Sequence, residues 1–183
     1  MKRSIHPRQC QTGNRKSDVE EVIVISHRDR ETYQVVKKLY SEKVMEHFKC
    51  PQNVGSMLDA NGEGSVGDPN CGDSLTIYVK VQDEIIIDIS FLVFGCTASI
   101  ATSSMTTVLA KGKSLRAALE ITEQDIIDSL GGLPKEKQHC SNLGVSALHK
   151  AIHNYRDREK QGISNSHSDN EFSLNFTVKT VRV

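Results

Sequence analysis

Residues 75–93, LTIYVKVQDEIIIDISFLV, decide the fold that we expect for this chain. Apolar and polar side chains alternate through residues 75–81 and again through residues 85–93, which is typical of strands that bury one face. The polar residues 82–84 between them form a plausible turn. The two segments are therefore predicted to pair as an antiparallel hairpin.

Helical patterns precede and follow this hairpin. Apolar residues recur at helical spacing over residues 32–48, and Cys50-Pro51 ends that helix because a residue before proline avoids the α conformation. Residues 55–67 are rich in glycine and are predicted to form turns. Later helices are expected over residues 100–109, after the candidate N-caps Ser114 and Thr122, and over residues 143–155. Strands that precede helices instead of alternating with them indicate an α+β fold.

The length and charge of the chain fit one domain with tails. Its 183 residues are enough for a single core. Basic and acidic residues number 23 each, so no general affinity for nucleic acid or an anionic membrane is expected. We expect a largely disordered N-terminal extension over residues 1–31, a domain over residues 32–159, and a tail over residues 160–183. Within that tail, residues 172–178 alternate like a β-arm.

The sequence predicts a cytoplasmic location. No apolar stretch approaches the ~20 residues that span a bilayer, and residues 1–17 are too polar for a secretory signal. An intracellular chain keeps its thiols reduced, and five cysteines, an odd number, argue against a fully paired disulfide framework. The basic, acid-free start before Asp18 leaves a presequence for a mitochondrion or a related organelle as the alternative.

Three of the cysteines lie among polar or glycine residues at predicted loops. Cys71 stands two residues before Asp73, Cys96 follows the second strand, and Cys140 follows His139. Three thiolates with Asp73 or His139 make a four-ligand set that suits zinc or an iron–sulfur unit. Because the spacings are wide, the fold itself must gather such a site.

Cys96 and Cys140 are both placed where a helix should begin. A helix N-terminus lowers the pKa of a thiol, so both are expected to be partly ionised near neutral pH. Thiolates bind metals and also attack disulfides or persulfides. Cys10 and Cys50 have no converging polar neighbours and are interpreted as small buried apolar side chains.

Four blocks of sequence strongly resemble U-type iron–sulfur cluster assembly scaffolds. They are YSEKVMEHFKCPQNVG at residues 40–55, GDPNCGD at 67–73, FGCTASIATSS at 94–104 and GGLPKEKQHCS at 131–141. Their order and separation fit that family over about residues 38–155, and the last block is closer to the NifU N-terminal type than to the IscU type. The IscU type carries a Leu-Pro-Pro-Val-Lys segment that a dedicated Hsp70 chaperone reads. Lys135 and Glu136 replace its second Pro and its Val, which argues against that partner.

This resemblance implies a small domain with an antiparallel sheet, helices packed on one face, and a transient [2Fe–2S] cluster. Cys71, Cys96 and Cys140 would be its ligands, Asp73 a weak fourth ligand that keeps the cluster labile, and His139 an alternative ligand or neighbour. Cys140 would also accept persulfide sulfur from a cysteine desulfurase. The other implied partners are an iron donor and apo iron–sulfur acceptor proteins, and the chain itself would not be an enzyme.

Other functions stay open at this stage. A structural zinc module would use the same ligands, since three cysteines with Asp73 or His139 satisfy tetrahedral zinc and zinc can occupy the isolated protein. A sulfur relay for thiolation pathways would need Cys140 but not Cys71. An enzyme with a Cys140–His139 dyad is disfavoured, because adjacent residues in a sequence seldom point at each other.

Overall fold

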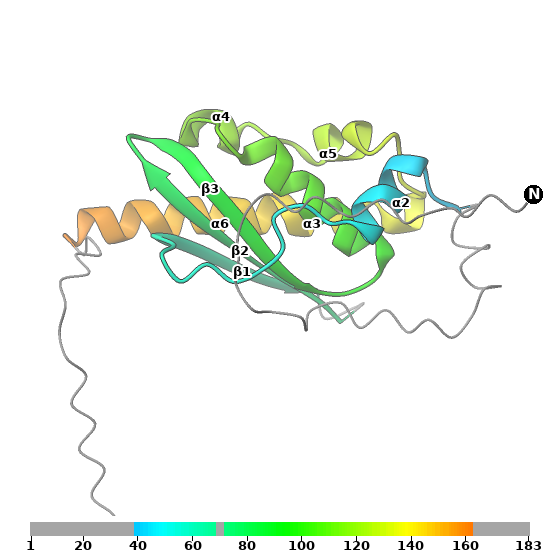
Figure 1. Cartoon of the computed structure of the whole chain (residues 1–183), viewed down its shortest axis with the longest axis horizontal. Helices are drawn as coiled ribbons and strands as arrows, with labels where there is room; N and C mark the ends of the chain where they lie inside the picture. The colour runs from blue at the N-terminus through cyan, green and yellow to red at the C-terminus, as the bar shows by residue number, and fades with distance from the viewer. Residues whose placement is uncertain (1–38, 69–71, 163–183) are drawn as a thin grey trace, which may run out of the picture.

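The computed structural model of the protein describes residues 39–68 and 72–162 (Figure 1). An antiparallel sheet has the strand order β1-β2-β3. Its strands are β1 (Gly62–Asp68), β2 (Asp73–Gln82) and β3 (Ile85–Phe94). The helices are α2 (Glu42–Lys49), α3 (Thr97–Ala110), α4 (Leu115–Leu119), α5 (Glu123–Ser129), the 3₁₀ turn η1 (Lys135–Lys137) and α6 (His139–Lys160). The predicted α+β fold is confirmed.

β2 and β3 form the hairpin that the alternating pattern predicts. Ile77 lies opposite Phe91 across the two strands, and both side chains are fully buried. Asp83 and Glu84 make the connection with φ angles of 51° and 60°. Two successive positive φ angles match the twist of a two-residue hairpin turn. The hairpin thus contributes Ile77 and Phe91 to the hydrophobic core.

β1 corrects the prediction that residues 55–67 form turns, because residues 62–68 are a strand paired with β2. The glycines that suggest turns serve close packing instead. A Cβ on Gly62 would lie 2.5 Å from the carbonyl oxygen of Ala151 in α6, and a Cβ on Gly64 would overlap the carbonyl oxygen of Ala147. Glycine in this strand therefore marks the close approach of a helix backbone.

α2 begins later than its apolar pattern predicts. Ser41 has extended backbone, with φ −61° and ψ 160°, and its hydroxyl accepts a hydrogen bond of 3.1 Å from the N–H of Val44. An N-cap at Ser41 ends any continuous helix over residues 32–48, so that prediction is wrong at this position. The predicted end is confirmed, since α2 stops at Lys49, just before Cys50-Pro51.

The predicted starts of the later helices are confirmed. Ser114 caps α4, and Thr122 caps α5 in a reciprocal capping box with Asp125. Cys96 is the N-cap residue of α3, and Cys140 lies in the first turn of α6. Both cysteines thus occupy helix starts, as their sequence context predicts.

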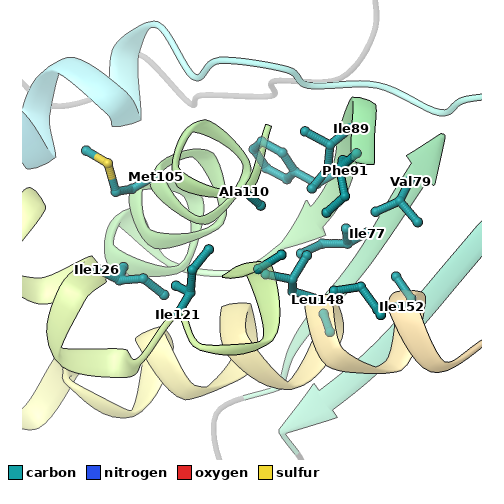
Figure 2. Packing of buried hydrophobic residues seen from close by; sticks show 14 of the residues in the cluster. Ile77, Val79, Ile89, Phe91, Met105, Ala110, Ile121, Ile126, Leu148 and Ile152 are labelled. Carbon is teal, nitrogen blue, oxygen red and sulfur yellow. The ribbon is translucent and has the colours of Figure 1, made fainter. Parts of the chain in front are cut away.

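The core lies between the sheet and the helices α3 and α6. Figure 2 shows Ile77 and Val79 of β2 near Leu148 and Ile152 of α6, and Met105 of α3 belongs to the same buried cluster. Burying these aliphatic side chains removes their apolar surface from water, which is the main favourable term in folding.

Both edges of the sheet are covered within the described residues. On β1, the N–H of Glu63 donates to Asn154 Oδ1 at 3.1 Å, and Lys150 Nζ donates to the carbonyl oxygen of Ser65 at 3.2 Å. On β3, the N–H and C=O of Phe91 pair with the backbone of residues 53–55. These contacts occupy backbone groups at the strand edges, which could otherwise pair with a strand of another chain.

The structure describes no helix with the length and apolar character needed to cross a membrane, over residues 39–68 and 72–162. The predictions for residues 1–31, Cys10, Cys71 and residues 172–178 fall outside the described part of the chain.

Candidate metal centre

Three elements meet at one end of the sheet and bring Asp73, Cys96 and Cys140 together. Asp73 is the first residue of β2, and the antiparallel register places it beside the end of β3, where Ser74 pairs with Phe94. The chain leaves β3 and enters α3 at Cys96, while α6 delivers Cys140. One donor atom from each of the three side chains lies within 4.8 Å of the others.

The distances in this group suit a metal ion. Cys96 Sγ and Cys140 Sγ are 3.9 Å apart, and each lies 4.0 Å from Asp73 Oδ2. A tetrahedral metal with bonds of about 2.3 Å separates two sulfur ligands by about 3.8 Å. The two sulfurs therefore already have the spacing that one shared metal requires.

Burial makes the same group chemically unusual. The side chains of Asp73 and Cys140 are only 5% and 1% exposed, and Cys96 is half-buried. The hydroxyl of Ser99 donates a hydrogen bond to Asp73 Oδ2. A buried carboxylate and buried thiols need partners, and a metal ion is the partner that satisfies all three together.

The sequence also predicts His139 as a site residue, and it lies beside the group of three instead of within it. His139 Nε2 lies 3.5 Å from Cys140 Sγ, at the margin of the group. This contact corrects the expectation that neighbouring His139 and Cys140 point apart. Cys50 is disulfide-bonded, so the interpretation of its sulfur as a lone apolar side chain is wrong. Cys71 lies outside the described residues.

The two thiols of the group ionise unequally in the absence of metal. The hydrogen bond from the Cys140 thiol, helped by the backbone N–H of Ser99, lowers the pKa of Cys96 to about 5 despite burial. The same hydrogen bond, together with burial, raises the pKa of Cys140. The expectation that both thiols ionise near neutral pH is therefore wrong for Cys140, because a thiolate already lies beside it. A buried, protonated Cys140 also argues against a free Cys–His dyad.

We expect iodoacetamide to alkylate Cys96 faster than Cys140 in metal-free protein. Between about pH 6 and about pH 8 the Cys96 rate should change little, whereas a thiol with the ordinary pKa of about 8.5 would react roughly a hundredfold faster at the higher pH. Quenched time points analysed by peptide mass spectrometry would give both rates. Equal rates at the two cysteines, or a Cys96 rate that climbs with pH like a free thiol, would contradict the assignment.

Sequence reasoning assigned no site role to Ser99 or Tyr40. Burial raises the pKa of Tyr40, and the negative charge of the Cys96 thiolate raises it further. The sequence signal for Ser99 is its position three residues after Cys96, which places it in the first turn of α3.

An open groove borders the group on the side of His139. Its volume is about 410 Å³, and it lies between β1 and the first turns of α6. Its lining residues are Val66, Gly67, His139, Asn142, Leu143, Ser146 and Lys150. Among these lining residues, His139 is the one whose Nε2 lies 3.5 Å from Cys140 Sγ.

Comparison with known proteins shows which family this chain is similar to. The family described as "NifU-like N terminal domain" matches residues 39–162. The chain is 56% identical over 117 residues to the iron–sulfur cluster assembly scaffold protein IscU 1 of Archaeoglobus fulgidus, which covers 64% of this chain and 76% of that protein. It is 48% identical over 122 residues to the nitrogen fixation protein NifU of Azotobacter chroococcum mcd 1, covering 66% of this chain and 40% of NifU.

A solved structure agrees on the fold. The N-terminal NifU-like protein of Brucella abortus has a TM-score of 0.53 and 18% sequence identity to this chain. The similarity covers 67% of this chain and 98% of that one. At this identity the likeness concerns the fold alone.

Proposed function

Because the chain belongs to the NifU-like N-terminal domain family, we propose that it is a scaffold on which an iron–sulfur cluster is assembled and then passed to apo-proteins. Relatives named as iron–sulfur cluster assembly scaffold proteins support this role. The observation that carries it is the convergence of Asp73 Oδ2 and the sulfurs of Cys96 and Cys140 within 4.8 Å. A scaffold of this kind carries its cargo and does not turn over a substrate.

In finer detail, the proposed cargo is a labile [2Fe–2S] cluster. Cys96 and Cys140 would supply two sulfur ligands, with the spacing already given. Cys71, two residues before Asp73 in the sequence, would supply the third. Asp73 is the proposed fourth ligand, and His139, 3.5 Å from Cys140 Sγ, is the proposed substitute or neighbour. Iron is the metal donated to this site, and zinc fits the same donors in isolated protein.

Sulfur is proposed to arrive on Cys140 as persulfide from a cysteine desulfurase. The Cys140 thiol passes its proton to the neighbouring Cys96 thiolate while its sulfur attacks the outer sulfur of the donor persulfide. The donor S–S bond breaks, and the desulfurase cysteine leaves as a thiolate. Because Cys140 is 1% exposed, this step requires the start of α6 to move, and the groove beside His139 is the side of approach.

Asp73→Ala is expected to give a more persistent cluster and slower transfer to an acceptor. Oxygen is a poorer partner than thiolate for a soft site, so the carboxylate is the ligand that an incoming acceptor thiolate displaces first. Transfer half-lives of wild type and variant to one apo-ferredoxin would be compared by circular dichroism. Equal half-lives would count against a releasing role for Asp73.

The function itself is tested by reconstitution under anaerobic conditions. Metal-free protein receives ferrous iron, cysteine and a cysteine desulfurase, and visible absorption and Mössbauer spectra are recorded. We expect a cluster signal that passes to apo-ferredoxin when the acceptor is added. Stoichiometric zinc that chelators remove only as the fold melts, with no cluster under any condition, would instead identify a zinc module.

The sulfur relay makes a separate prediction in the same experiment. A relay needs only the persulfide on Cys140, so its sulfur transfer would survive Cys71→Ser. A scaffold loses its cluster in that variant, because a ligand is gone. Persulfide on Cys140 is measured by mass spectrometry alongside the cluster spectrum, which separates sulfur acceptance from cluster assembly.

A further inference from the structure

The carboxylate of Asp73 is buried at the centre of the site and needs something to fix its orientation. Its side chain is 5% exposed. The terminal torsion of an aspartate is broad, so the two oxygens do not choose a direction by themselves. Among the described residues, the one hydroxyl that donates to this carboxylate belongs to Ser99, and it donates to Oδ2.

Oδ2 is also the oxygen that faces the sulfurs. It lies 4.0 Å from Cys96 Sγ and 4.0 Å from Cys140 Sγ. Ser99 thus holds the oxygen that a shared metal would contact. A carboxylate oxygen accepts more than one partner, so the hydrogen bond leaves a lone pair of Oδ2 for the metal.

The surrounding packing locks this arrangement. Ser99 is 2% exposed and lies in the first turn of α3. Gly95 passes over both partners, since a Cβ at Gly95 would lie 2.9 Å from Asp73 Cγ and 2.9 Å from Ser99 Cβ. The absence of a side chain at Gly95 is what allows Asp73 and Ser99 to meet.

We propose that Ser99 is a positioning residue that holds Asp73 Oδ2 toward the two thiols, so that this oxygen fills the ligand position beside Cys96 and Cys140. The inference rests on the proposed function only in requiring that the site take a metal. Partners of this kind behind a metal ligand orient it, and losing one typically weakens metal binding by about 10–100-fold.

Cobalt titration of metal-free protein tests the proposal without a cluster. Co²⁺ bound to thiolates shows sulfur-to-cobalt charge-transfer bands, and its d–d bands respond to the other ligands. Ser99→Ala is expected to weaken Co²⁺ binding about tenfold. Its charge-transfer bands should stay, and its d–d bands should move to those of Asp73→Ala. Ser99→Thr keeps the hydroxyl and should keep the wild-type spectrum.

Ser103→Ala is the matched control. Ser103 lies one turn further along α3, is also 2% exposed, and donates its hydroxyl to the carbonyl oxygen of Ser99 at 2.7 Å. The same atom is removed from the same helix, but Asp73 keeps its partner. Its Co²⁺ affinity and spectrum should match those of wild type, and thermal melts of every variant record any loss of folding.

A double variant decides whether Ser99 acts through Asp73. In the Asp73→Ala background, Ser99→Ala should cause no further change in Co²⁺ affinity, because residues that act as one unit are not additive. Ser99 also lies 3.6 Å from Cys96 Sγ, and a full tenfold loss in that background would show that it acts on the thiolate instead, which overturns the proposal. An unchanged Ser99→Ala spectrum, or a Ser99→Thr spectrum like that of Ser99→Ala, overturns it equally. If the wild-type protein showed no charge-transfer bands, that result would contradict the proposed function as well.

Discussion

Cys96→Ser and Cys140→Ser should each lower the zinc affinity of the protein more than a hundredfold and prevent a cluster from persisting. Structural zinc sites with four ligands are worth about 10–16 kcal/mol, so one ligand accounts for about 3 kcal/mol. That loss is more than a hundredfold in affinity. Serine offers a neutral oxygen in place of a thiolate, and it breaks the 3.9 Å sulfur pair that suits one metal. Competition with a chromophoric chelator measures the zinc affinity.

Cys50→Ser provides the control for this experiment. Cys50 is the residue that follows α2, and it does not belong to the group formed by Asp73, Cys96 and Cys140. Under reducing conditions its replacement removes a thiol without touching that group. Zinc affinity in Cys50→Ser should therefore stay near that of wild type. Affinities within threefold of wild type for Cys96→Ser or Cys140→Ser would show that the metal binds elsewhere.

The parts of the fold that local chemistry determines were predictable from the sequence. The alternation in residues 75–93 predicts β2 and β3, and Ser114 and Thr122 mark helix starts because their hydroxyls cap backbone N–H groups within the next turn. Each of these signals acts over a few residues. They therefore appear in the sequence without knowledge of the tertiary structure.

β1 and the start of α2 were not predictable in this way. Glycines such as Gly62 and Gly64 are typical of turns. Only the packing of α6, some 85 residues later in the sequence, explains why they stand in a strand. Ser41 lies within a helical apolar pattern, yet its hydroxyl caps the next helix and also donates to the carbonyl oxygen of Leu130. In both cases a contact distant in sequence decides the local structure.

The site likewise combines features that the sequence predicts with features that depend on contacts between distant parts of the chain. Cysteines at helix starts and the motif resemblance indicate Asp73, Cys96 and Cys140 as candidates, and the structure brings these three together. The unequal ionisation of the two thiols was not predictable, because it depends on a contact between Cys96 and Cys140, which are 44 residues apart. The hydrogen bond from Ser99 to Asp73 likewise joins two elements that the sequence does not place side by side.

Gly64→Ala is expected to lower the free energy of unfolding by about 3 kcal/mol or more, an unusually large effect for one methyl group. The added Cβ would overlap the backbone of α6 at Ala147 and Ala151. A flexible side chain can move aside, but a helix backbone can retreat only as a unit. Urea unfolding with linear extrapolation measures the loss.

Gly67→Ala is the matched control, because it makes the same substitution on the same strand. A Cβ at Gly67 would meet only the carbonyl oxygen of Asp73, at 3.7 Å, which is ordinary contact. Stability should therefore change little in Gly67→Ala. In Gly64→Ala the retreat of α6 also carries Cys140 away from Cys96, so zinc affinity should fall together with stability. A Gly64→Ala protein as stable as Gly67→Ala would show that α6 does not pack against β1 in solution, and a destabilised one with unchanged zinc affinity would show that the metal site tolerates movement of α6.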